Sequence, residues 1–95
     1  MNKESTDFYQ NLKKLLDETS SWPSEYVYKL IYRSNPKNIE ILKDIFRDSN
    51  ADFKIKKSKN QKYTSVSVSL IAKSPDLIID NYKKVAQKIE NVILL

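Results

Sequence analysis

The chain has 95 residues, of which 40% are hydrophobic and 31% are charged, and its formal net charge is +5. A chain of this length supports one small core, so we expect residues 1–95 to form a single domain. The sequence contains no cysteine, histidine or glycine. Their absence excludes disulfides, thiolate metal ligands, the commonest general base and glycine-rich phosphate loops.

Targeting signals are not apparent in the sequence. No stretch approaches the roughly 18 consecutive apolar residues of a membrane span, and residues 1–7 lack the apolar segment of a signal peptide. We therefore expect a cytoplasmic protein that has no membrane partner. We also expect no metal and no cofactor, because the sequence shows no pattern of ligands for either.

The first predicted element is a helix that ends near Glu18. Its apolar residues recur at helical spacing, at Phe8, Leu12, Leu15 and Leu16. A cap for this helix is available from one of three residues, Ser5, Thr6 or Asp7. Residues 19–24 then form a turn-rich connector in which Pro23 forbids helix. We expect Trp22 to anchor this connector to the core.

Residues 25–33 are rich in aromatic and β-branched side chains and predict a strand. The face assigned to the core consists of Tyr26, Tyr28, Leu30 and Tyr32. The opposite face consists of Val27, Lys29, Ile31 and Arg33, and its two cations favour solvent. The tyrosines, together with Tyr82 further on, could line a ligand pocket, but we favour core rings whose hydroxyls reach the rim.

A second helix is predicted to begin at Pro36, after a capping residue, and to end near residues 48–50. Its buried stripe is Ile39, Leu42, Ile45 and Phe46. Residues 52–57 follow as a short strand with Phe53 and Ile55 toward the core. Asp44 and Asp48 lie one helical turn apart, and we interpret both as solvated carboxylates flanked by cations.

Residues 63–73 alternate almost strictly and predict a long central strand. One face carries Val66, Val68, Leu70 and Ala72, and the other carries Ser65, Ser67 and Ser69. Residues 59–62 are the loop of the hairpin that precedes this strand.

Ser74 and Pro75 predict the start of a third helix. The apolar stripe of this helix is Ile78, Tyr82, Val85 and Ile89. Residues 92–95 are apolar and predict a last, short strand.

After the first helix, the predicted order is β-α-β-β-α-β. This order is typical of the ferredoxin-like arrangement, an α+β fold with two helices on one face of a four-stranded antiparallel sheet. The expected spatial order is fourth, first, third and second strand, so the strands at residues 25–33 and 63–73 are central. Residues 1–21 are then an added N-terminal helix and connector, and residues 22–95 form the core.

Three stretches resemble the YbeD-like family of small bacterial proteins of unknown function. Residues 22–31 begin Trp-Pro and continue into a strand, as in the family. Residues 58–68 are similar to its hairpin pattern Ser-x-x-x-x-Tyr-x-Ser-Val-x-Val, and residues 91–95 to its terminal apolar strand. The resemblance covers about residues 8–95. The chain departs from the family at Gln61, where a glycine is frequent, and at Ser24, where a cysteine is usual.

This resemblance implies a ferredoxin-like fold similar to the ACT-type regulatory domains of metabolic enzymes. It does not supply an activity, because the family has none assigned. ACT-like domains often assemble by pairing sheet edges. The resemblance therefore also suggests a homodimer, with residues 92–95 as the edge that pairs with a second copy.

The net charge comes from one segment. Residues 54–62 carry five of the 17 basic residues and no acid, so the other twelve balance the 12 acidic residues. The predicted strands place cations and one tyrosine on or beside the open sheet face, and this candidate anion or partner surface consists of Lys29, Arg33, Lys54, Lys56, Lys57, Lys59, Lys62 and Tyr63. Such a surface suits nucleic acid. Alternatively, lysines on an edge strand prevent aggregation between sheets.

The open face also carries Val27 and Ile31, and Ile71 is a further candidate. Exposed β-branched residues can mark a partner surface. Alternatively, the N-terminal helix covers part of this face with Phe8, Leu12 and Leu15. The sequence does not decide between these two arrangements.

The predicted function is that of a non-catalytic regulatory or accessory module that binds a protein partner or a small effector in ACT-like fashion. The alternative is an RNA- or DNA-binding module that uses the basic hairpin at residues 54–62. We expect no enzyme, because catalysis would have to rest on Lys, Asp, Glu, Tyr or Ser without histidine or cysteine.

Overall fold

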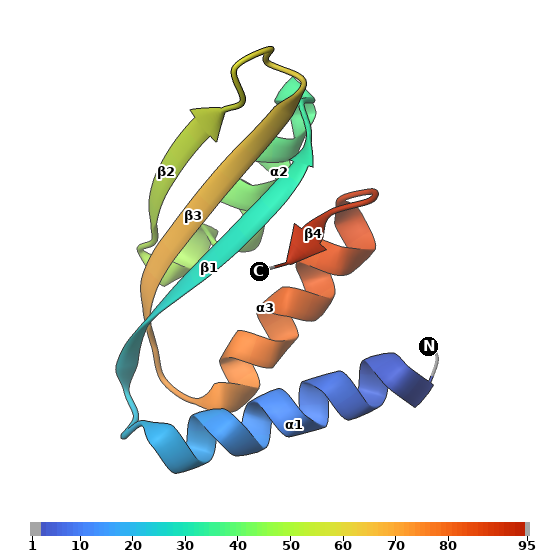
Figure 1. The fold of residues 1–95 in the computed structure, drawn as a ribbon. Coiled ribbons are helices and arrows are strands. Elements are labelled where there is room, and N and C mark those ends of the chain that lie inside the picture. Colours follow the sequence, from blue (N-terminus) through green and yellow to red (C-terminus); the bar gives the residue numbers. More distant parts are fainter. Residues whose placement is uncertain (1–2, 95) are drawn as a thin grey trace.

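The computed structural model describes the backbone of residues 3–94 and the side chains of residues 7–94. Figure 1 shows the order of the elements. They are α1 (Lys3–Thr19), β1 (Ser24–Arg33), α2 (Pro36–Ile45), the short 3-10 helix η1 (Arg47–Ser49), β2 (Asp52–Lys57), β3 (Tyr63–Ala72), α3 (Pro75–Lys88) and β4 (Ile93–Leu94).

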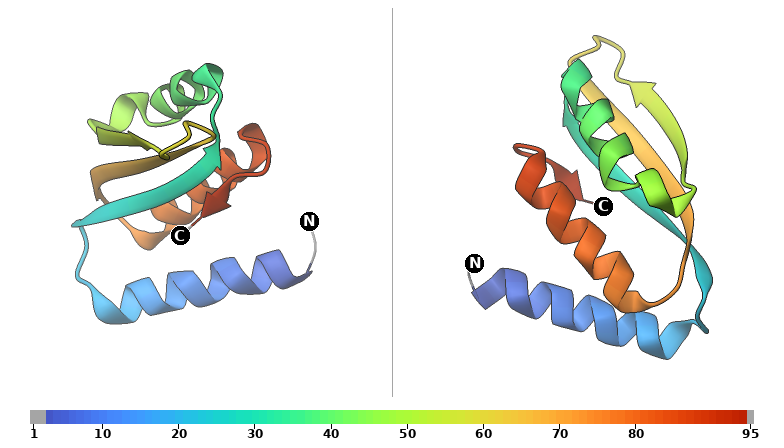
Figure 2. Two further views of the ribbon diagram at one scale, coloured as in Figure 1. Left: turned by 45° about the horizontal axis from the view of Figure 1, so that its top comes forward. Right: turned by 180° about the vertical axis from the view of Figure 1, so that it is seen from behind.

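The four strands form one sheet in the order β2-β3-β1-β4, and every neighbouring pair is antiparallel. Seen from behind, α2 and α3 both lie in front of the sheet, so they cover the same face (Figure 2, right). The other face is turned toward the viewer in Figure 1. The predicted α+β, ferredoxin-like fold and its strand order are therefore confirmed, with α1 as the added helix.

The core lies between the sheet and its two helices. Alternate residues of the central strands point into it, including Tyr28, Leu30, Val66 and Val68, as their period of two predicts. Phe53 of β2 is half-buried and packs against this core. Ile55 was also expected to face the core, yet it is 49% exposed. It lies in an edge strand, which has a neighbouring strand on one side only.

Capping residues begin α2 and α3 as predicted. The Asn35 side chain accepts a hydrogen bond of 3.0 Å from the backbone N–H of Lys37, and Ser74 Oγ accepts one of 3.4 Å from the N–H of Leu77. Prolines occupy the first turns, where a missing N–H costs nothing. The helix of α2 ends earlier than residues 48–50, at Ile45, and η1 continues the chain to Ser49.

Two predicted boundaries differ in the structure. The helix α1 begins at Lys3, so Ser5, Thr6 and Asp7 lie inside it and none of them is its N-terminal cap. The last strand is limited to Ile93 and Leu94 among the described residues, and Leu95 lies outside them. Both differences are end effects, where a single turn or residue pair contributes little free energy.

The helix α1 packs beside α3 and leaves the open sheet face uncovered (Figures 1 and 2). Leu16 is buried in the core, and the indole N–H of Trp22 donates a 3.3 Å hydrogen bond to the Leu16 carbonyl. Trp22 itself packs against the core, so its predicted anchoring role is confirmed. The arrangement in which α1 covers the open face is wrong, because the apolar stripe of α1 meets α3 and the core instead.

Candidate anion or partner surface

The register of the sheet arranges the predicted cations in rows across the open face. Lys29 of β1, Ser67 of β3 and Lys54 of β2 are direct neighbours. The next row joins Ile31, Ser65 and Lys56. Because side chains alternate between the two faces of a strand, the neighbours of buried Val66 and Leu30 in β3 and β1 point to this open side. The small serines of β3 therefore separate the cations of β1 from those of β2.

The last pair of this face is Arg33 opposite Tyr63, beside the hairpin loop. Tyr63 is 44% exposed, and the Lys62 ammonium lies 5.9 Å from the centre of its ring. A cation over an aromatic face is attracted by the quadrupole of the ring. The structure therefore brings together five of the predicted residues on one side of the sheet, namely Lys29, Arg33, Lys54, Lys56 and Tyr63.

The remaining predicted lysines lie around this group. Lys57 pairs with Thr64, which is buried, so its parity places it toward the helix side of the sheet. Lys59 and Lys62 are exposed residues of the loop. Lys57 is thus separated from the open face because a strand turns successive side chains to opposite faces.

Hydrogen bonds within the hairpin hold its loop in one shape. The Ser58 N–H donates to the Tyr63 carbonyl at 2.8 Å, and the Tyr63 N–H donates to Ser58 Oγ at 3.0 Å. Asn60 Oδ1 accepts hydrogen bonds from Ser58 Oγ at 2.9 Å and from the Lys62 N–H at 3.0 Å. These bonds fix the backbone that carries Lys59 and Lys62, although both side chains extend into solvent.

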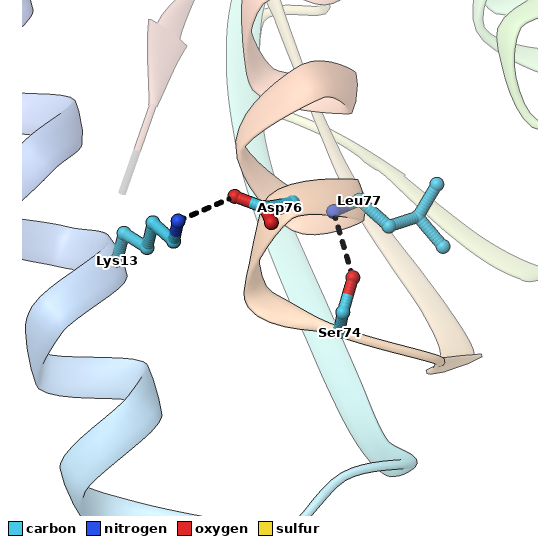
Figure 3. A network of polar contacts seen from close by, with 4 residues as sticks. All are labelled: Lys13, Ser74, Asp76 and Leu77. Atoms are coloured by element: carbon cyan, nitrogen blue, oxygen red, sulfur yellow. Dashed lines mark hydrogen bonds and ion pairs between the residues drawn. The ribbon is translucent and has the colours of Figure 1, made fainter.

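The cations of this surface have no carboxylate partner among the described residues. The ion pairs found there are Lys13–Asp76 at 2.9 Å, drawn in Figure 3, and Asp44–Arg47 at 3.4 Å. The acids of the open face, Asp52 and Glu25, belong to rows at the other end of the strands. The open face is therefore basic near the hairpin and acidic near the start of β1.

Apolar side chains accompany the cations. Val27, Ile71 and Ile93 are exposed, and Ile31 is half-buried. A cavity of about 280 Å³ lies where β1, β3 and β4 meet, and its lining consists of Ile31, Tyr32, Arg33, Tyr63, Asn91 and Ile93. Sequence reasoning missed Asn91 and Ile93. The predicted strand order pairs the last strand with the first. That pairing places Ile93 opposite Ile31, and it was the signal that could have identified Ile93 as part of the lining.

The buried tyrosines form part of the core. The Tyr26 and Tyr82 hydroxyls lie 2.8 Å apart, the Tyr28 hydroxyl donates to the Ile78 carbonyl at 3.2 Å, and the amide of Asn81 donates to the Tyr28 oxygen at 3.3 Å. Burial raises the pKa of Tyr28 and of Tyr82 well above the usual range for a phenol. Their interpretation as core rings is confirmed. The hydroxyl of Tyr28 was expected at the rim, but it is buried and hydrogen-bonded inside the core.

The described part of the chain contains no group of three or more acidic side chains that could hold a metal ion. Asp44 pairs with Arg47, as expected for a solvated carboxylate flanked by cations. Among the same residues, no helix has the length and apolar character needed to cross a membrane.

Comparison with known proteins agrees with this architecture. The fold and its open, basic sheet face define a small ferredoxin-like α+β protein with an added helix. Residues 17–95 match the model of a family described as proteins of unknown function (DUF493), so the chain belongs to this family, and the predicted YbeD-like resemblance is confirmed. No curated protein matches the chain. The match begins at residue 17, so most of α1 lies outside it.

The chain is also similar to the solution structure of protein HP0495 from H. pylori. The two share 21% sequence identity with a TM-score of 0.60, over 79% of this chain and 86% of that chain. At this level of sequence identity, the structural similarity supports the fold described above and carries no statement about function.

Proposed function

We propose that this protein is a non-catalytic accessory module that binds a partner protein or a small effector through the open face of its sheet. The observation that carries the proposal is the composition of that face. It combines four cations that have no carboxylate partner among the described residues with exposed aliphatic side chains: Lys29, Arg33, Lys54 and Lys56 beside Val27, Ile71 and Ile93. Uncovered surfaces that mix cations with apolar groups favour binding of acidic, amphipathic partners.

The absence of catalytic machinery in the sequence supports a binding role. The chain has no histidine and no cysteine, and burial raises the pKa of Tyr28 and of Tyr82 still further above neutral pH. Activated nucleophiles and general bases require groups that ionise near the working pH.

The cavity at the hairpin end of this surface offers a place for a small effector. Arg33 can bind a carboxylate through two parallel hydrogen bonds, and the Tyr63 hydroxyl and the Asn91 amide add donors. Ile31 and Ile93 line the same cavity and suit an apolar group on the ligand. The module would bind an effector of this kind in ACT-like fashion and act as a ligand-sensing domain.

Affinity capture with a matched variant tests the partner. Lys54→Glu/Lys56→Glu changes the open face, whereas Lys14→Glu/Lys84→Glu makes the same charge change on the exposed sides of α1 and α3. We expect a partner that wild type and the control retain and that the open-face variant loses. If the open-face variant and the control behave alike toward every captured protein, the open face is not the binding site.

A second candidate function is binding of single-stranded RNA or DNA, and the pairing of Arg33 with exposed Tyr63 beside the lysines favours it. RNA-binding sheets usually carry more exposed aromatics than this face offers, which places this function second.

Fluorescence anisotropy with short single-stranded RNA at low and physiological salt tests whether the protein binds RNA. Binding would weaken by about 0.7 log units per log unit of salt for each phosphate contacted, and Lys54→Glu/Lys56→Glu would abolish it. If no binding occurs even at low salt, we would interpret the lysines as residues that prevent aggregation at the β2 edge.

A further inference from the structure

The cavity where β1, β3 and β4 meet carries charge of one sign only. Its lining contains one cation, Arg33, and no acid among the described residues; the other members are two isoleucines, two tyrosines and an asparagine. Glu90 precedes Asn91 along the chain but does not line the cavity. The volume of about 280 Å³ is close to the lower end of the range for small-molecule sites. The cavity therefore suits a small anion better than a zwitterion.

The register of the sheet separates the polar end of this cavity from its apolar end. Ile31 and Arg33 are alternate residues of β1, so their side chains lie on the same face, about 7 Å apart along the strand. Ile93 is paired with Ile31, and Tyr63 is paired with Arg33. One end of the cavity is thus formed by two β-branched side chains, and the other by a guanidinium and a phenol.

The polar end offers hydrogen-bond donors to a ligand. Arg33 is exposed, and neither ion pair among the described residues includes it. A guanidinium binds a carboxylate through two parallel hydrogen bonds. Asn91, whose φ of 56° places it in the turn between α3 and β4, brings an amide to the same cavity, and the Tyr63 hydroxyl can also donate. A ligand with a further acceptor beside its carboxylate can use these additional donors.

We propose that this cavity binds short aliphatic 2-oxo acids, which carry a carboxylate and no amino group. The inference rests on the proposed function and specifies the class of its small effector. The carboxylate lies against Arg33, the oxo group accepts a hydrogen bond from Tyr63 or Asn91, and the aliphatic tail lies between Ile31 and Ile93. With carbon–carbon bonds of about 1.5 Å, an acid of about six carbons spans the distance of about 7 Å between the two ends.

Charge disfavours the corresponding amino acids. The ammonium group of an amino acid is attached to the carbon next to the carboxylate, so it would lie close to the Arg33 guanidinium, which has the same charge. The described lining contains no acid with which the ammonium could pair. Removing an unpaired charge from water is costly. The cavity should therefore distinguish an oxo acid from the amino acid that has the same carbon skeleton.

Nuclear magnetic resonance titration of the isotope-labelled full chain with matched ligands tests the proposal. The probes are 4-methyl-2-oxopentanoate and leucine, which differ in the oxo and ammonium groups. We expect the oxo acid to bind with a Kd of about 1 mM or below and to shift the amide signals of Ile31, Arg33 and Asn91. Leucine should bind at least about tenfold more weakly. The neutral ketone 4-methyl-2-pentanone lacks the carboxylate and should cause no comparable shifts.

Variants of the polar end locate the site. Arg33→Gln removes the guanidinium and should weaken binding of the oxo acid about tenfold or more. Lys56→Gln is the matched control, because it removes the same charge from the same face outside the cavity lining. It should retain the wild-type Kd within about twofold. Asn91→Gly removes the amide and keeps a residue that adopts positive φ without a steric cost, so we expect a loss of about threefold.

Three outcomes would overturn this inference. One is the absence of signal shifts at about 10 mM oxo acid. Another is binding of leucine as tight as that of the oxo acid. The third is equal weakening by Arg33→Gln and Lys56→Gln, which would indicate attraction by the basic face as a whole. The proposed function would fail separately, in the affinity capture with Lys54→Glu/Lys56→Glu, because neither lysine lines the cavity.

Discussion

Among the residues that the structure describes, three adopt left-handed backbone angles, and each one ends an element or turns a loop. Asn50 has φ of 52° after η1, Gln61 has φ of 59° in the hairpin loop, and Asn91 has φ of 56° between α3 and β4. Asparagine tolerates this region better than most side chains. Gln61 has no such advantage, so the hairpin loop holds backbone strain at that residue.

Replacing Gln61 with glycine should relieve this strain. We expect Gln61→Gly to raise the free energy of unfolding by about 0.5–1 kcal/mol, since glycine adopts the left-handed region without a steric cost. Urea denaturation followed by circular dichroism measures the change. Lys59→Gly is the matched control, because Lys59 is exposed in the same loop and does not have a positive φ. The control should be neutral or slightly destabilising, and an equal gain in both variants would refute the account of Gln61.

The buried phenols make stability fall at alkaline pH. Burial raises the pKa of Tyr82 in the folded state, whereas the unfolded chain ionises its tyrosines near pH 10. Above about pH 10 the unfolded state therefore binds fewer protons than the folded state, and unfolding becomes more favourable as pH rises. Below that pH the stabilisation is fully present.

Denaturation at pH 8, 9, 10 and 11 measures this effect, with Tyr82→Phe for comparison. Each buried phenol should remove up to about 1.4 kcal/mol of stability per pH unit above pH 10. The wild-type curve should consequently fall more steeply than that of Tyr82→Phe. Parallel curves above pH 10 would show that Tyr82 ionises in the folded protein as it does in the unfolded one.

At the scale of elements, α1 is attached by one side of its apolar stripe. Tyr9, Leu12 and Leu16 pack against the core, and the Lys83 ammonium lies 5.4 Å from the centre of the Tyr9 ring. The close-up in Figure 3 shows Lys13 of α1 reaching Asp76 in the first turn of α3. Phe8 and Leu15 belong to the same stripe, yet they are 54% and 56% exposed. One side of the stripe, rather than its whole width, holds α1 in place.

Two adjacent leucines of α1 should therefore differ sharply in their contribution to stability. Leu16→Ala removes a buried side chain and should lower the free energy of unfolding by about 2–3 kcal/mol. Leu15→Ala has the same chemistry at an exposed position, so its effect should stay within about 0.5 kcal/mol. Thermal and urea denaturation of both variants measure the difference. Equal losses would mean that α1 packs through another face.

At the scale of the whole molecule, charge and free strand edges determine how the protein meets other molecules. Lys54 and Lys56 place positive charge along the β2 edge, and residues 24–29 of β1 have no partner strand on their outer side among the described residues. That residues 1–95 form one domain stays a prediction.

Alternation and capping residues in the sequence were sufficient to predict the element order and the buried faces of β1 and β3. The strand order then followed from the ferredoxin-like arrangement that this element order indicates. The open-face positions of Lys29, Lys54 and Lys56 followed from the same parity. This worked because a strand has a period of two and a cap acts on its own helix. Ile55 lies on the predicted face, opposite buried Val66, but it is 49% exposed because it belongs to an edge strand.

The amino-acid sequence by itself determined the ferredoxin-like order of elements, the two faces of each long strand and the concentration of positive charge in the hairpin. These features depend on residues close together along the chain. Only the tertiary structure decided that α1 packs beside α3, that Asn91 and Ile93 complete the cavity with Arg33, and that residues 24–29 of β1 have a free edge. Such features arise where distant segments meet, and the competition between those contacts is settled by packing of the whole core rather than by local preference.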